Sequence, residues 1–313
     1  MRRILFEGVS AVVDLVVPGS GVDLAVRDFG GSGPPILLLH GGGNTVVDMT
    51  PLATHLADGH RVVGMDLRNH GFSGDGPWEW DAVLADIRAV IEALELGSPV
   101  LVGHSLGGML ATLYAERYAG IAAVVNLDGF GDGTPVPGDL TEDEALRLRE
   151  LLRAVGEESL VAFSRPRNPS EVVAERDAWI AGSQALGLDA VLAAEAYDRR
   201  LVQHDDGSAT MRPARARLEE IRPAVERLDL LPLYREAAVP HLVHVALHLG
   251  LEAMPEELRA LVAARARGLR RQLQLVAEQQ SNVRVVEVEA SHGLIYECPE
   301  LIAQQIRELV PQP

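Results

Sequence analysis

The chain has 313 residues, enough for one large or two small domains, and 47% of them are hydrophobic, as in globular proteins with a sizeable core. The formal net charge of −17 argues against a nucleic-acid partner, because binding phosphates requires a concentrated basic surface. A single cysteine, Cys298, excludes an internal disulfide, and no uncharged apolar run is long enough to cross a membrane, so we expect a cytoplasmic protein.

Short β-rich segments alternate with amphipathic stretches over the first 128 residues and again near the C-terminus. This alternation is the pattern of parallel βαβ units. Between two such segments, Val83, Ile87, Val90 and Ile91 keep helical spacing, which predicts a surface helix packed on a sheet. The strands predicted in this way cover residues 36–39, 61–65, 100–102, 121–127, 241–247 and 283–288.

The alternation stops after residue 128. A Gly/Pro-rich connection is followed by Thr141 and Glu144, whose spacing predicts a capping box at the start of a helix. From there to about Leu231 the pattern indicates helices and one turn, without a strong buried strand. We therefore expect an α/β core built from residues 1–132 and 232–313, with an inserted helical cap, or lid, at residues 133–231.

A serine lies between glycines directly after one of the predicted strands, in Gly103-His104-Ser105-Leu106-Gly107. Small residues on both sides of the serine allow a tight strand-to-helix turn that holds it in a strained conformation. Ser105 is then a candidate nucleophile at the carboxyl edge of the sheet, where the following helix N-terminus stabilises developing negative charge. The alternative is a glycine-rich turn with an incidental serine.

A second glycine-rich segment, Leu39-His40-Gly41-Gly42-Gly43-Asn44, follows an earlier predicted strand. Such a loop can bring backbone N–H groups close to a substrate oxygen, and an acyl-transfer intermediate needs two of them. The amides of Gly42 and Leu106 are the candidates for this oxyanion hole. The alternative is a run that only turns the chain; a phosphate loop is excluded because no Lys-Ser/Thr follows.

These segments resemble the α/β-hydrolase fold family, and the resemblance extends to GMDLRNHGFSG at residues 64–74, to VVNLDG at 124–129 and to ASHGLIYECPE at 290–300. It implies an α/β fold with a mostly parallel eight-stranded sheet, helices on both faces and a lid after the sixth strand. It also implies a nucleophile, an acid and a histidine in that chain order. Dehalogenases and epoxide hydrolases of this fold carry aspartate at the position of Ser105, so those activities are not expected.

The family places its catalytic base in a late loop, which here contains His292. The serine hydroxyl is a poor nucleophile at neutral pH, so a base must remove its proton and later protonate the leaving group. Three further histidines, His241, His244 and His248, are close in sequence, but a strand would place the first on the opposite face from the other two. We therefore expect neither a metal nor a cofactor.

The carboxylate that orients the histidine is the irregular part of the pattern. Family members commonly supply it after the seventh strand, where this chain reads VPHLVHVALHLGLEAMPEEL and has no aspartate. Asp128 ends the predicted strand 121–127, where some members carry the acid instead, and it is our predicted acid. Glu252 is the alternative, and a Ser–His dyad is the third arrangement.

The sequence thus predicts a cofactor-independent serine hydrolase that cleaves a carboxylic ester or a related acyl compound, such as a lactone or thioester. The substrate is expected to be a partly apolar small molecule, with no nucleic acid or membrane as partner. One alternative is a non-hydrolytic enzyme of the same fold, such as a cyclase or a perhydrolase. Another is a ligand-binding protein that retains the pocket.

Overall fold

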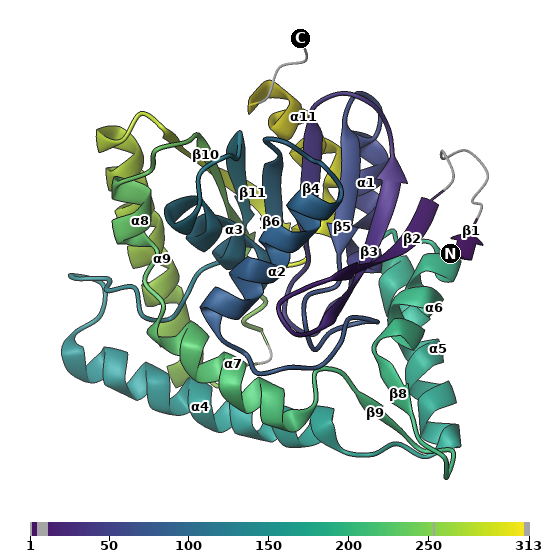
Figure 1. The fold of residues 1–313 in the computed structure, drawn as a ribbon. Helices are drawn as coiled ribbons and strands as arrows, with labels where there is room; N and C mark the ends of the chain where they lie inside the picture. The colour runs from purple at the N-terminus through teal and green to yellow at the C-terminus, as the bar shows by residue number, and fades with distance from the viewer. Residues whose placement is uncertain (1, 5–11, 253, 310–313) are drawn as a thin grey trace.

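A nine-stranded sheet forms the centre of the structure, a computed structural model that describes residues 2–4, 12–252 and 254–309 (Figure 1). Six neighbouring strands are parallel, and the remaining three continue the sheet antiparallel at one edge. The predicted mostly parallel sheet of eight strands is confirmed, and β1 adds a ninth strand beside β2. In sheet order the strands are β1 (Arg2–Ile4), β2 (Val12–Pro18), β3 (Asp23–Gly30), β5 (Arg61–Met65), β4 (Pro35–Leu39), β6 (Val100–His104), β7 (Ala123–Leu127), β10 (His241–His248) and β11 (Val283–Ser291).

The six parallel strands are the six that the sequence predicts. Strands inside the sheet, such as β4, β6 and β7, are aliphatic and mostly buried, whereas the edge strand β11 is only partly buried. In β4, Leu37 and Leu39 pack into one core cluster and Ile36 and Leu38 into the other, so both faces of the strand are covered. Parallel strands between two helical layers require such continuous apolar runs. The antiparallel strands β2 and β3 contain charged residues and are not predicted by the sequence pattern.

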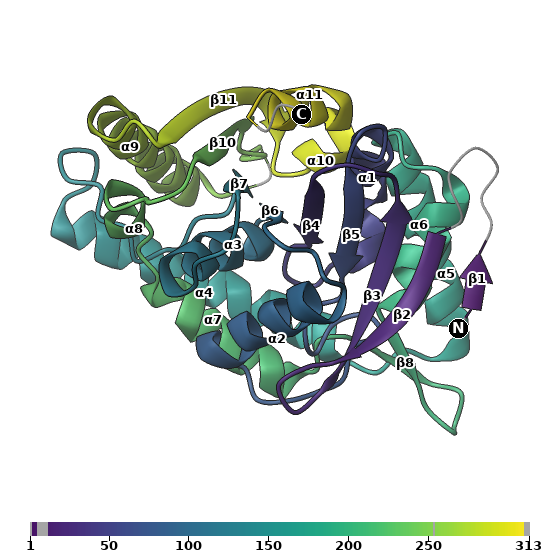
Figure 2. The same cartoon turned by 45° about the horizontal axis from the view of Figure 1, so that its top comes forward.

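Helices cover both faces of the sheet. Figure 2 shows α1, α10 and α11 on one side of the strands and α2 and α3 on the other, in agreement with the two core clusters. The first face carries α1 (Thr50–Leu56), α10 (Leu294–Glu297) and α11 (Pro299–Leu309), and the second carries α2 (Trp80–Ala93), α3 (Leu106–Arg117), α8 (Leu231–Arg235) and α9 (Glu256–Gln279). Among the described residues, no helix is both long and apolar enough to cross a membrane.

Residues 133–231, here called the cap segment, contribute no described strand to the nine-stranded sheet. Figure 1 shows α4 and α7 across one end of the sheet, with α5 and α6 near β2 and β3. The capping box is confirmed, because Thr141 Oγ1 accepts from the Glu144 amide and Glu144 Oε2 accepts from the Thr141 amide. The cap segment contains α4 (Glu142–Ser164), α5 (Pro169–Ala185), α6 (Ala190–Arg199), α7 (Arg215–Arg227) and a hairpin of β8 (Leu201–Gln203) and β9 (Ala209–Met211). That the cap segment forms a unit separate from the α/β core stays a prediction.

Candidate active site

Ser105 lies in the tight turn between β6 and α3, with φ of 52° and ψ of −116°. A positive φ is strained for a residue with a side chain, so the surrounding structure must hold it. The amide of Ser105 donates to the Leu127 carbonyl at 2.9 Å, and its carbonyl accepts from the Gly108 amide at 2.9 Å. A Cβ on Gly103 would overlap the Gly107 backbone, and a Cβ on Gly107 would overlap the Leu39 carbonyl. The turn therefore requires both glycines that flank the serine.

The glycine loop, residues 41–44, follows β4 and lies against this turn. A Cβ on Gly41 would lie 3.2 Å from Ser105 Cβ, and a Cβ on Gly42 would lie 3.7 Å from Leu106 Cδ2. Leu106 is the first residue of α3, where helix amides have no intrahelical acceptor. The structure thus brings together the two predicted donors, Gly42 and Leu106, beside the serine.

His40 holds the start of the glycine loop. Its Nδ1–H donates to the Gly41 carbonyl at 2.7 Å, and its Nε2 accepts from the Leu67 amide at 3.0 Å. The ring is fully buried, and burial lowers the pKa of His40, so it remains neutral in this tautomer. The loop is therefore anchored at its first glycine by a side chain that carries no charge.

His292 and Asp128 meet at the same edge of the sheet. His292 Nδ1 lies 2.7 Å from Asp128 Oδ2, while Asp128 Oδ1 accepts from the Ala246 amide at 3.0 Å. Asp128 directly follows β7 and has a positive φ of 56°. Its side chain is 16% exposed, whereas that of His292 is 58% exposed. Both carboxylate oxygens of Asp128 are thus occupied, and one of them faces the histidine.

The alternative acid, Glu252, lies in an exposed turn before α9. Among the residues that the structure describes, Asp128 is the carboxylate within hydrogen-bond distance of His292 Nδ1. In the described part of the segment after β10, residues 249–252 and 254–258, no carboxylate contacts His292 Nδ1, although the acid commonly lies there in this fold.

His104, the residue before the serine, contacts the histidine loop in a way that the sequence does not predict. Its Nε2–H donates to the His292 carbonyl at 2.8 Å, and the two ring centroids are 4.8 Å apart. Burial, followed by the neighbouring His292, lowers the pKa of His104 to about 4. His104 is therefore neutral near pH 7 and fixes the backbone of His292.

The three histidines near β10 have separate partners. His241 Nδ1 contacts the Val239 carbonyl, His244 Nε2 contacts Gln305, and His248 Nε2 contacts Glu289. Nowhere in residues 2–4, 12–252 and 254–309 do three or more His, Cys, Asp or Glu side chains form a group that could hold a metal ion. These histidines therefore carry no argument for metal chemistry.

A cavity of about 490 Å³ opens beside the glycine loop, between α4 and α7. The loop contributes Gly42 and Gly43 to its wall, so the cavity reaches Gly42, one of the two predicted oxyanion donors. Most of the remaining wall is apolar. Ser159, charged side chains of the two helices and one carboxylate from the segment before α4 complete it. The apolar lining residues are Leu152, Gly156, Leu160, Phe163, Leu218, Ile221 and Val225, and the charged ones are Asp132, Arg149, Arg153, Arg222 and Glu226.

Comparison with known families and structures agrees with the observed fold. Residues 34–164, which include the glycine loop, Ser105 and Asp128, match the model of the α/β hydrolase fold family. The chain has the α/β-hydrolase fold. A likeness to the crystal structure of E-2-(acetamidomethylene)succinate hydrolase, with a TM-score of 0.68 and 24% identity, covers 96% of this chain and 99% of that one.

Sequence relatives of the chain include an esterase, a lipase and another hydrolase. The AB hydrolase superfamily protein YisY of Bacillus subtilis is 39% identical over 32% of this chain and 38% of its own length. The sn-1-specific diacylglycerol lipase ABHD11 of Xenopus tropicalis is 35% identical over 35% of this chain and 39% of its own. The chain thus spans about two fifths of these relatives. The 2-(acetamidomethylene)succinate hydrolase of Mesorhizobium japonicum is 29% identical over 71% of this chain and 73% of its own.

Proposed function

We propose that this α/β-hydrolase is a serine hydrolase of carboxylic esters or related acyl compounds, acting without a cofactor. The observation that carries the proposal is the 2.7 Å contact between His292 Nδ1 and Asp128 Oδ2, at the edge of the sheet where Ser105 lies in its strained turn. A neutral imidazole whose Nδ1–H faces a carboxylate has Nε2 free to accept a proton. This is the arrangement that a serine nucleophile requires.

In the proposed reaction, Ser105 Oγ attacks the substrate carbonyl carbon while His292 Nε2 accepts its proton. The amides of Gly42 and Leu106 stabilise the negative oxygen of the tetrahedral intermediate. His292 then protonates the leaving group, and the acyl group remains on Ser105. Water, deprotonated by His292, attacks this ester and releases the acid, which restores the free serine.

The cavity between α4 and α7 is the proposed site of the acyl group, because its wall includes Gly42 and is mostly apolar. An acyl group bound there places its carbonyl oxygen near the proposed oxyanion donors. The names of relatives and structural neighbours, which include an esterase, a diacylglycerol lipase and a thioesterase domain, also support an acyl substrate. The proposed substrate class is therefore an ester or thioester with a partly apolar acyl chain.

The test is a panel of chromogenic esters with graded acyl lengths, measured with and without a serine-directed fluorophosphonate. Turnover that the fluorophosphonate abolishes supports the proposal. Covalent labelling without turnover of any ester, lactone or thioester would contradict hydrolysis and favour a non-hydrolytic role. An absence of both labelling and turnover would contradict the serine mechanism itself.

A bulky residue in the cavity wall is expected to shorten the acyl chains that the enzyme accepts. Gly156 lies in α4, and a Cβ there would lie 3.7 Å from the end of the flexible Arg222 side chain, so Gly156→Leu fits but fills cavity space. Excluding about four methylene groups costs about 3 kcal/mol, or about a hundredfold in kcat/KM for a long-chain ester. For the acetate ester, we expect a change of less than about threefold.

The matched control is Gly182→Leu. Gly182 is also a helical glycine of the cap segment, in α5, and a Cβ there would meet nothing within 4 Å. This variant should keep the chain-length profile of the original protein. If Gly156→Leu also keeps that profile while remaining folded, the acyl group does not occupy this cavity.

A further inference from the structure

An arginine of the cap segment reaches the glycine loop. Arg200, directly after α6, donates from Nε to the Gly43 carbonyl at 3.0 Å. Its Nη2 donates to Asn44 Oδ1 at 3.0 Å and to Asp48 Oδ1 at 2.7 Å. The side chain is 3% exposed, and its Cζ lies 4.1 Å from the ring centroid of Trp179. One buried side chain thus makes three hydrogen bonds to the segment that follows β4.

Within the glycine loop, the Asn44 amide donates to the Gly41 carbonyl at 3.1 Å. Gly43 lies inside this turn with a φ of 73°, and a Cβ there would meet nothing within 4 Å. Glycine has more backbone freedom than any other residue, and a misplacement of about 1 Å can cost about a hundredfold in rate. Hydrogen bonds from Arg200 therefore restrain the second half of the loop, at Gly43 and Asn44. His40 anchors its start, at Gly41.

Asp48 connects this arginine to the histidine loop. Its Oδ2 accepts from the Thr45 amide at 2.7 Å, and its Oδ1 accepts from both Arg200 and the Tyr296 hydroxyl, the latter at 2.6 Å. Burial opposes ionisation, but Arg200 and Tyr296 hold the pKa of Asp48 below its ordinary value. Tyr296 lies four residues after His292, in α10. The Asp48–Arg200 pair therefore joins the glycine loop, the cap segment and the histidine loop.

We propose that Arg200 is a positioning residue for the oxyanion hole. By fixing the Gly43 carbonyl and Asn44, it orients the neighbouring Gly42 amide toward the tetrahedral intermediate. Through Asp48, it holds the loop in register with the segment that follows His292. This inference rests on the proposed function, and Arg200 acts through the loop rather than on the reacting atoms.

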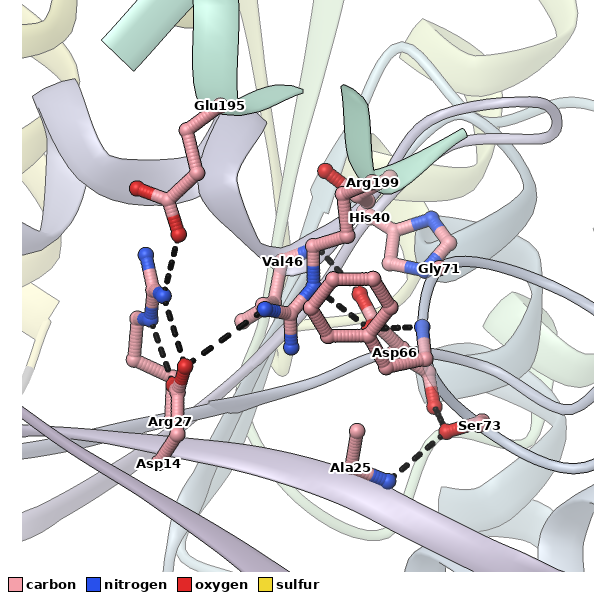
Figure 3. A network of polar contacts seen from close by, with 12 residues as sticks. Asp14, Ala25, Arg27, His40, Val46, Asp66, Gly71, Ser73, Glu195 and Arg199 are labelled. Carbon is pink, nitrogen blue, oxygen red and sulfur yellow. Dashed lines mark hydrogen bonds and ion pairs between the residues drawn. The ribbon is translucent and has the colours of Figure 1, made fainter. Parts of the chain in front are cut away.

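Arg199 provides a matched control, because it is the neighbouring arginine and is equally buried. Its Nε donates to Asp66 Oδ2 at 2.7 Å, and its Nη1 lies 3.5 Å from Asp14 Oδ2 (Figure 3). It also packs on an aromatic ring, that of Phe72, at 4.3 Å. Asp66 in turn accepts from the Val46 amide. Arg199 thus attaches the same end of α6 to the core without a hydrogen bond to residues 41–44.

The experiment compares Arg200→Gln with Arg199→Gln in the full chain, using an ester that the unmodified protein hydrolyses. We expect Arg200→Gln to lower kcat about thirtyfold to a hundredfold, with KM changed less than about threefold, because only the transition state carries the oxyanion. The rate of fluorophosphonate labelling should fall in parallel, since it passes through a similar tetrahedral oxyanion. Arg199→Gln should lower the Tm about as much as Arg200→Gln does, but its kcat should stay within about threefold of that of the unmodified protein.

Arg200→Lys decides the question if the glutamine variant fails to fold. Lysine keeps the charge beside Asp48 but lacks the planar fork that reaches Asp48 and Gly43 together, so kcat should fall about tenfold with the fold retained. A kcat equal to that of the unmodified protein, or equal losses in the Arg199 and Arg200 variants at matched stability, would overturn the proposal. If the unmodified protein itself hydrolyses no ester, the proposed function is contradicted instead. Failure of the Arg200 proposal and failure of the proposed function are thus distinguishable.

Discussion

Ser105→Ala is expected to abolish ester turnover, lowering kcat by several orders of magnitude, because it removes the proposed covalent nucleophile. The fold should be retained, since alanine differs from serine only by the hydroxyl and meets the same steric demand at the positive φ of residue 105. The flanking glycines and the hydrogen bonds of the Ser105 backbone do not depend on the side chain. The measurements are kcat and KM on the preferred ester, thermal unfolding and the intact mass after fluorophosphonate treatment.

Ser183→Ala is the control for this change. Ser183 is a buried serine of α5, and its loss should leave both turnover and labelling unaffected. In the unmodified protein, peptide mapping should place the fluorophosphonate adduct on Ser105. An adduct on another residue, or turnover close to normal in Ser105→Ala, would show that the nucleophile lies elsewhere.

The fold could be predicted because burial restricts composition. The inner parallel strands β4, β6 and β7 are covered on both faces and therefore contain mostly aliphatic residues, which the sequence displays directly. The hairpin of β8 and β9 has only three residues in each strand and is partly exposed, so it leaves no such signal. Local composition thus predicts the elements that the core buries, and misses those that lie at the surface.

The candidate site could be predicted only where a residue lies at a strand end. Ser105, Asp128 and His292 follow β6, β7 and β11, so the order of the strands brings them to one edge. The contact of Arg200 with Gly43 spans 157 positions and depends on how the cap segment packs. The chain has 28 arginines and no lysine, so no single arginine is distinctive in the sequence. Such contacts become visible only in three dimensions.

Asp128→Asn is expected to lower kcat about a thousandfold or more while preserving the shape and burial of the side chain. In the structure, Oδ1 accepts from the Ala246 amide and Oδ2 faces His292 Nδ1. An asparagine will keep its oxygen toward the Ala246 amide and present its NH₂ group to His292. The imidazole then has to accept at Nδ1 and carry its proton on Nε2, where it cannot accept the proton of Ser105.

Glu252→Gln is the control, because Glu252 lies in an exposed turn and should contribute little to kcat, with a change within about twofold. Rates are compared at a pH where both variants are folded, with thermal unfolding measured in parallel. If Asp128→Asn is nearly silent and Glu252→Gln is severely impaired, the acid follows β10 and the 2.7 Å contact of Asp128 is only structural. If both variants keep normal activity, Ser105 and His292 act without either carboxylate. The expected pattern is a large loss of kcat in Asp128→Asn alone. It would place the acid after β7, because the carboxylate of Asp128 then fixes the His292 tautomer that the serine mechanism requires.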